Sequence, residues 1–117
     1  ENAEGSVITE EDVLRAEPEF YRVLDNGFFK VRYERCSDAD KKFIFAMVRC
    51  GELPCTISNV AKNLHKRVSA ISTMRAQLIS KGIIYSEKHG ELDFTVPEFD
   101  GFIRRHPDYD QWLKDQF

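Results

Sequence analysis

The spacing of apolar residues between positions 56 and 97 constrains the fold of this chain more than any other feature. It predicts two short helices in succession, with Lys66 and Arg67 in the turn between them. Gly82 follows the second helix, and glycine readily adopts the left-handed conformation that ends a helix. The second helix has one apolar face, because its apolar side chains recur at spacings of three and four: Ile71, Met74 and Leu78.

Two segments of β type follow the second helix. Residues 83–85 and 92–96 surround the turn residues 88–90, and the second segment alternates apolar and polar side chains with a period of two. Two helices followed by a hairpin predict a winged helix–turn–helix, in which the second helix is shaped to enter the major groove of DNA. We therefore expect a mainly α fold with a small β-hairpin.

A long amphipathic helix is predicted ahead of the winged helix–turn–helix. Pro18 interrupts this helix and should kink it or restart it. We expect its apolar stripe to pack under the winged helix–turn–helix; the alternative is a seam to a neighbouring domain. The stripe consists of residues at helical spacings: Val13, Ala16, Phe20, Leu24, Phe28 and Val31.

Three further helix starts are predicted from local chemistry. Ser37 and Asp40 match a capping box, Pro97 suits the first turn of a helix after the wing, and Pro107 could begin a last short helix. The helix after Ser37 should point four apolar residues inward: Phe43, Ile44, Met47 and Val48. We divide the chain into a lid-like lead-in segment at 1–36, the winged helix–turn–helix domain at 37–105, and a tail or short helix at 106–117.

The net charge of −3 is distributed unevenly along the chain. Residues 1–20 hold one Arg against seven acidic residues, residues 21–90 hold 13 basic residues against six acidic ones, and residues 91–117 hold three against seven. The basic middle coincides with the predicted helix–turn–helix. The acidic flanks should weaken non-specific affinity for DNA or face a positively charged partner.

Candidate DNA contacts follow from the predicted inward face of the second helix. Its opposite face carries small polar residues that can hydrogen-bond base edges or phosphates, with Gln suited to adenine: Ser69, Ser72, Thr73 and Gln77. Basic residues in the turn, on the helix flank and at the wing tip could meet phosphate oxygens or the minor groove: Lys66, Arg67, Arg75, Lys88 and His89. The opposing interpretation is that the charges at turns serve solubility. In addition, the outward face of the second helix has no arginine, which is unusual for a protein that binds a specific DNA sequence.

The three cysteines make an odd number, which argues against a disulfide framework and suits a reducing cytoplasm. Cys50 and Cys55 could join His65 or His89 at a zinc ion, but a second pair of ligands at metal spacing is missing. Small buried hydrophobic side chains are the better interpretation. No apolar run approaches the roughly 20 residues that span a bilayer, and no signal peptide is visible. We expect a cytoplasmic protein without membrane contact.

The sequence also lacks the signatures of common enzyme sites. It contains no GxxxxGK[ST] phosphate loop, no HExxH and no GxSxG. The acidic residues are spaced as capping and surface residues, and the three histidines fall at predicted helix ends or turns. We expect no catalytic residue, no metal and no cofactor within this chain.

Several segments resemble a known family. They are ITEEDVLRAEPEFYRVLDNGFFKVRYERCSDADKKFI, ISNVAKNL and MRAQLISKGIIYSEKHGELDFTVPEFDGFIRR, of which RAQLISKGIIYS and LDFTVPEFDGFIRR are the most distinctive. The region from Ile8 to Arg105 resembles the C-terminal winged-helix region of bacterial and archaeal AAA (STAND-type) P-loop ATPases. Cys36 departs from the larger aliphatic residue expected at its position. The acidic tail beyond His106 lies outside the resemblance.

The resemblance implies a non-catalytic C-terminal domain of an ATP-binding parent protein. The lead-in helices would then be the end of the ATPase lid, and the missing initiator Met would mark a fragment of a longer chain. ATP and magnesium would bind to the parent protein, because the phosphate-binding lysine and the Walker B acid are not in this chain.

Two functions of different class follow. In the first, the domain contacts double-stranded DNA through residues 66–77 and the wing. In the second, it is a protein-interaction or regulatory module that docks on its own ATPase domain or on another protein, without DNA. The acidic flanks, the lack of arginine on the outward face and the long amphipathic helix favour the second. A stand-alone transcriptional regulator is less favoured, because the lead-in resembles a lid rather than a dimerisation arm.

Overall fold

A computed structural model describes residues 24–88 and 90–117 of the chain. The chain divides into two compact units, Glu1–Val31 and Arg32–Phe117. The predicted kink at Pro18 and the start of the apolar stripe lie outside the described residues. So does His89, one of the candidate DNA contacts.

The described end of the first unit is helical, but its phase differs from the prediction. A π-helix, η1 (Leu24–Phe29), continues into α2 (Lys30–Glu34), which runs on into the second unit. Phe28 and Val31 are 43% and 59% exposed, so the prediction that both pack in the core is wrong. A π-helix closes its hydrogen bonds over five residues rather than four, which rotates the following side chains away from the face that α-helical spacing predicts. Phe29 is buried instead.

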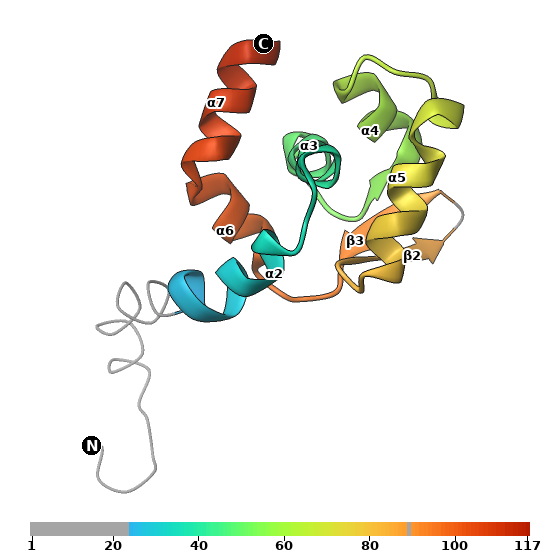
Figure 1. The fold of residues 1–117 in the computed structure, drawn as a ribbon. Helices are drawn as coiled ribbons and strands as arrows, with labels where there is room; N and C mark the ends of the chain where they lie inside the picture. The colour runs from blue at the N-terminus through green and yellow to red at the C-terminus, as the bar shows by residue number, and fades with distance from the viewer. Residues whose placement is uncertain (1–23, 89) are drawn as a thin grey trace, which may run out of the picture. The chain divides into compact units, whose positions relative to one another are not determined.

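The second unit is a winged helix–turn–helix (Figure 1), as the sequence predicts. Its sheet has the order β1–β3–β2 and is antiparallel throughout. The third strand, β1, was not expected from the sequence. After α2 the elements are α3 (Asp38–Arg49), β1 (Cys55–Thr56), α4 (Ile57–Asn63), α5 (Val68–Ser80), β2 (Ile84–Lys88), β3 (Glu91–Phe94), α6 (Phe99–Arg105) and α7 (Pro107–Gln116).

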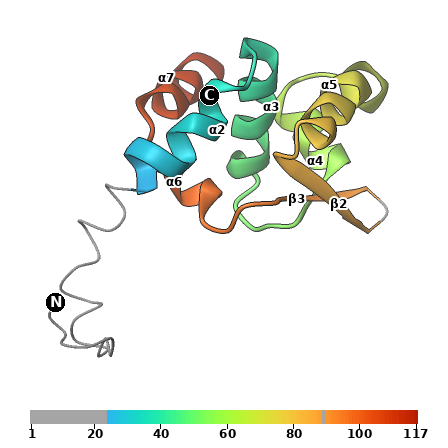
Figure 2. The same ribbon diagram turned by 60° about the horizontal axis from the view of Figure 1, so that its bottom comes forward.

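Helix α3 lies at the centre of this unit, between α4 and α5 on one side and α6 and α7 on the other (Figures 1 and 2). Its residues 43–48 are all buried, which confirms the four predicted inward positions and adds two more. A helix that is apolar all round is a core helix. On the α7 side, Phe45 packs against Tyr109 and Trp112, with ring centroids 5.8 Å apart in both pairs.

The wing is tied to the segment that leads into α4. Strand β1 places Cys55 opposite Leu92 of β3, and the Ile57 amide donates to the Gly90 carbonyl over 2.6 Å. On the outer strand the register shifts by one residue between Ser86 and Lys88, which marks an irregularity just before the wing tip. The hairpin is therefore anchored to the start of α4.

The helices after the wing begin partly where the sequence predicts. Pro107 is the first residue of α7, as expected, and His106 caps this helix by accepting from the Asp108 amide. Pro97 does not lie in the first turn of α6, because Glu98 adopts a left-handed conformation with φ of 71°. This turn redirects the chain, so that α6 begins only at Phe99.

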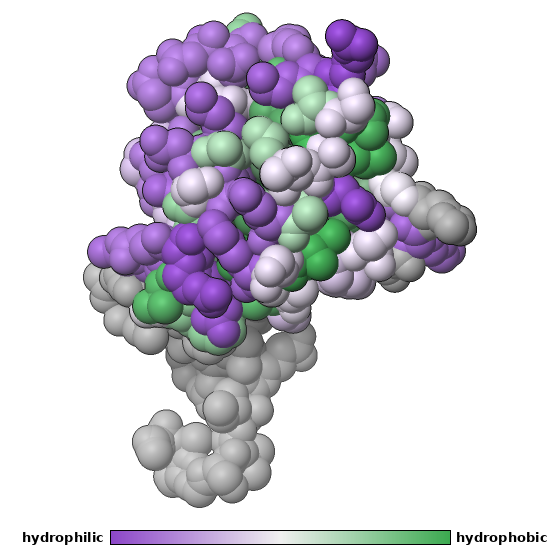
Figure 3. All heavy atoms as spheres, turned by 45° about the vertical axis from the view of Figure 1, so that its right-hand side comes forward, coloured by the Kyte–Doolittle hydropathy of each residue, from purple (hydrophilic) through white to green (hydrophobic). Residues whose placement is uncertain are grey.

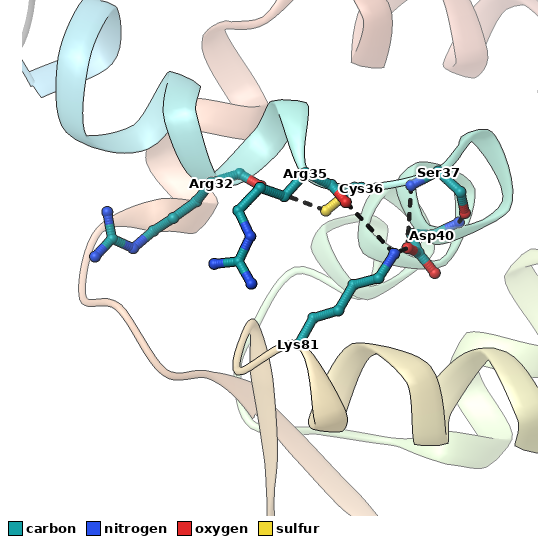
Figure 4. A network of polar contacts seen from close by, with 6 residues as sticks. All are labelled: Arg32, Arg35, Cys36, Ser37, Asp40 and Lys81. Carbon is teal, nitrogen blue, oxygen red and sulfur yellow. Dashed lines mark hydrogen bonds and ion pairs between the residues drawn. The ribbon is translucent and has the colours of Figure 1, made fainter.

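The start of α3 and the end of α5 meet at a buried carboxylate (Figure 4). Asp40 closes the predicted capping box: its Oδ2 accepts from the Ser37 amide over 3.0 Å, and its own amide donates to Ser37 Oγ over 3.1 Å. The same Oδ2 forms an ion pair with the Lys81 ammonium. Burial alone would raise the pKa of the Asp40 carboxyl, but Lys81 and Ser37 stabilise the charged form and hold that pKa below its usual value.

We predict that Asp40→Asn destabilises the protein at neutral pH and that the difference from wild type shrinks in acid. A depressed pKa in the folded state contributes stability above the pKa of the unfolded state, about 3.9, and that contribution is lost as the pH falls through the folded-state value. Thermal unfolding of both proteins between about pH 7 and pH 2 measures the gap in Tm. A gap that is constant over this range would show that the Asp40 charge does not carry the effect.

Candidate nucleic-acid interface

The turn before helix α5 has a defined geometry. Thr56 caps α4 by accepting from the Asn59 amide over 3.2 Å. At the other end of α4, His65 has a φ of 58°, and the Lys66 amide donates to the Ala61 carbonyl over 3.0 Å. This is the six-to-one bond of a left-handed helix stop, with histidine in the place that glycine usually takes. The stop fixes the direction in which the chain enters α5.

The first turn of α5 is open toward negatively charged groups. Arg67 is its N-cap residue, and the Arg67 side chain makes no capping hydrogen bond. The first turn also contains no acidic residue. Helix N-terminal amides and the helix dipole favour anions, and a capping side chain would otherwise occupy part of this position.

The two faces of α5 differ in burial as the sequence predicts, with one qualification. Ile71 and Leu78 are fully buried, and Met74 is half-buried rather than inside the core. Ser72 is exposed but donates to the Ser69 carbonyl over 3.1 Å, so part of its hydrogen-bonding capacity is used within the helix. The predicted outward residues are all exposed: Ser69, Ser72, Thr73 and Gln77.

The end of α5 is set by Gly82, which has a φ of 76°. The Gly82 amide donates to the Ile79 carbonyl, and the Ile83 amide donates to the Leu78 carbonyl, each over 3.0 Å. These two bonds form a Schellman motif, so the predicted glycine stop is confirmed. Ile83 and Ile84 then enter the core, which directs β2 alongside α5 (Figure 1).

The candidate basic residues lie at separate points around α5. Lys66 and Arg67 are exposed in the turn, and Lys88 is exposed at the end of β2. Arg75 is half-buried on the helix flank. Among residues 24–88 and 90–117, the side chains of these four residues have no hydrogen bond or ion pair. Their charges are thus available to an outside partner.

The sequence-based set of contacts missed three exposed apolar residues on α5 and on the strand that follows it. Val68 and Ile79 lie on α5, and Tyr85 lies on the adjacent strand β2. A spacing of eleven residues places Val68 and Ile79 on the same helix flank as Arg75. Figure 3 shows this side as a mixture of hydrophilic and hydrophobic surface rather than one continuous apolar area. The exposure of these residues had no signal in the local sequence.

The cysteines are free thiols in this structure. Cys36 and Cys55 are buried. Burial of the Cys36 thiol raises its pKa to about 11. Cys50 is half-buried, and its sulfur accepts from the Asn63 side-chain amide over 3.5 Å. Within the described residues, no three His, Cys, Asp or Glu side chains are grouped so that they could hold a metal ion.

The helices that the structure describes include none that is both long and apolar enough to cross a membrane. A family model described as Domain of unknown function (DUF8462) matches residues 26–103. The chain belongs to this family. The DUF8462 match spans the helix–turn–helix, the wing and most of α6, and ends before α7. No curated protein and no solved structure shows significant similarity to the chain.

We predict that substitutions on the two faces of α5 differ strongly in how much they destabilise the protein. Ile71→Ala removes a fully buried side chain and should lower the free energy of unfolding by about 2–5 kcal/mol. Gln77→Ala changes an exposed side chain and should stay within about 0.5 kcal/mol of wild type. Urea titration followed by circular dichroism measures the free energy of unfolding of both variants and of the wild type. Equal losses in the two variants would mean that the inward face of α5 is assigned incorrectly.

Proposed function

We propose that this chain is a non-catalytic winged-helix domain that contacts double-stranded DNA through residues 66–77 and the wing. One observation carries the proposal: α5 has an exposed polar face, and at its open N-terminal end stand two cations, Lys66 and Arg67, without partners in the described residues. A phosphate group fits such a position, because the helix dipole and both cations act on it together.

In the proposed complex, the different residues have different roles. A phosphate at the start of α5 would set the register of the helix on the duplex. Thr73 and Gln77 would face base edges, and Lys88 would reach the backbone beside the wing. The exposed face of α5 has no arginine or lysine that could bind guanine by two hydrogen bonds. Affinity would therefore come mainly from phosphates, with modest sequence preference.

The resemblance of Ile8 to Arg105 to the C-terminal region of AAA (STAND-type) ATPases supports a place for this domain in a larger protein. In that setting the domain would bring an ATP-binding parent to DNA, and ATP and magnesium would bind outside this chain. Free thiols suit a reducing compartment, which supports a cytoplasmic location.

Docking on a protein is the second candidate function, and the exposed apolar residues favour it. Val68 and Ile79 lie beside the small side chains of α5, a combination that permits close packing of another helix. The partner would be the ATPase domain of the parent or another protein. This function predicts no affinity for duplex DNA even at low salt.

We predict that the chain binds a labelled random duplex at about 50 mM salt and loses most of that affinity at about 200 mM. Lys66→Ala with Arg67→Ala should make the slope of log K against log salt shallower by about 2, because each lost phosphate contact contributes about 0.9. Fluorescence anisotropy over a salt series measures the slope.

The matched control is Lys42→Ala with Lys114→Ala. It removes two exposed cations from α3 and α7 and leaves the turn intact. A slope that changes equally in both double variants would show that net charge, and not the turn, determines binding. Absence of binding at both salt concentrations would exclude the DNA function and leave the protein-docking function.

A further inference from the structure

The ammonium group of Lys81 joins the end of α5 to the junction between α2 and α3, which lies more than 40 residues earlier in the sequence (Figure 4). Lys81 is the C-cap residue of α5. Its Nζ forms an ion pair with Asp40 in the first turn of α3, and donates to the Arg35 carbonyl, directly after α2, over 3.4 Å. The end of the recognition helix is therefore attached to the junction between α2 and α3.

The attachment is buried on the Asp40 side and partly open to water on the Lys81 side. The Asp40 side chain is fully buried, and the Lys81 side chain is 33% exposed. Within the described part of the chain, Asp40 is the one charged residue that is fully buried, and its Oδ1 has no hydrogen-bond partner there. Lys81 is thus the cation that compensates a buried carboxylate, and its removal would leave that charge unpaired.

The hydrogen bonds that cap α3 do not involve Lys81. The reciprocal hydrogen bonds between Ser37 and Asp40 already cap its first turn and hold the carboxylate in place. Likewise, the Schellman motif at Gly82 ends α5 by backbone bonds alone. The contacts of Lys81 are therefore specific to the relative position of α5 and the α2–α3 junction.

We propose that Lys81 is a positioning residue for the DNA-contacting face: its ammonium couples α5 to the α2–α3 junction, so that a displacement of this junction displaces the recognition helix. This inference rests on the proposed DNA function and names a regulatory input to the same site. In the chain, α2 follows η1 directly and ends at this junction, so a displacement transmitted along α2 would act on Lys81.

A general charge effect on DNA binding predicts a different pattern from coupling. Lys81→Met removes one positive charge, whereas Asp40→Asn removes one negative charge. If only net charge mattered, the first substitution would weaken duplex binding and the second would strengthen it. Coupling predicts that both weaken it, because both break the same ion pair. Lys81→Arg keeps the charge and the donor, and should restore much of the wild-type behaviour.

The experiment uses the 117-residue chain with Lys81→Met, Lys81→Arg and Asp40→Asn, and with Lys114→Met as the control for charge. Circular dichroism first sets a temperature at which each variant tested is folded. Hydrogen exchange then measures the exchange rates of the backbone amides in the last turn of α5 and in residues 35–37. Fluorescence anisotropy measures the Kd for the random duplex.

Coupling predicts faster exchange at both places in Lys81→Met, and a Kd at least about fivefold weaker than that of Lys114→Met. Unchanged exchange in Lys81→Met, or a Kd equal to that of Lys114→Met, would overturn the inference; so would tighter binding by a folded Asp40→Asn variant. If Asp40→Asn does not fold, the three lysine variants decide. If the wild type binds no duplex, the proposed function fails, and the exchange measurement alone tests the attachment.

Discussion

The burial of residues 43–48 on every side of the middle of α3 is the constraint on which the rest of the second unit depends. Because residues 43–48 all lie in the core, every helix that covers α3 must supply an apolar face. For α5 that face consists of Ile71 and Leu78. Their positions determine which side of α5 remains in solvent, so the proposed functional surface is a consequence of core packing. On the opposite side of α3, the aromatic residues of α7 supply the apolar face, and Trp112 packs on Phe45.

Asp40 is an exception within this apolar surrounding, and its environment explains why a charge is tolerated there. Two groups favour the ionised form: the Ser37 amide and the Lys81 ammonium. Replacing a buried ion pair by apolar residues of similar size is often neutral or stabilising, so stability alone is a weak reason for this pair. Directional bonds do fix geometry, however, because Lys81 can satisfy Asp40 and the Arg35 carbonyl in only a narrow range of positions of α5.

The sequence predicted the features that depend on neighbouring residues. The capping box at Ser37 and the glycine stop at Gly82 are local, and both are confirmed. The spacing of Ile71 and Leu78 was sufficient to separate the two faces of α5. Features that depend on distant residues or on backbone exceptions were missed. Strand β1 has two residues and exists through pairing with β3, and the π-helix gave no recognisable signal. The sequence also did not reveal that Val68 is exposed or that Asp40 pairs with Lys81, because the exposure depends on tertiary packing and the two charged residues are 41 positions apart.

The net charge of −3 is weak evidence against a DNA partner, because screening limits the range over which charges act. At physiological salt the Debye length is about 8 Å, so acidic residues much further than this from a bound phosphate contribute little to its energy. What matters is the charge close to the start of α5. There, Lys66 and Arg67 are exposed, and the first helical turn carries no acidic residue. The local field at α5 can therefore attract phosphate although the chain as a whole is acidic.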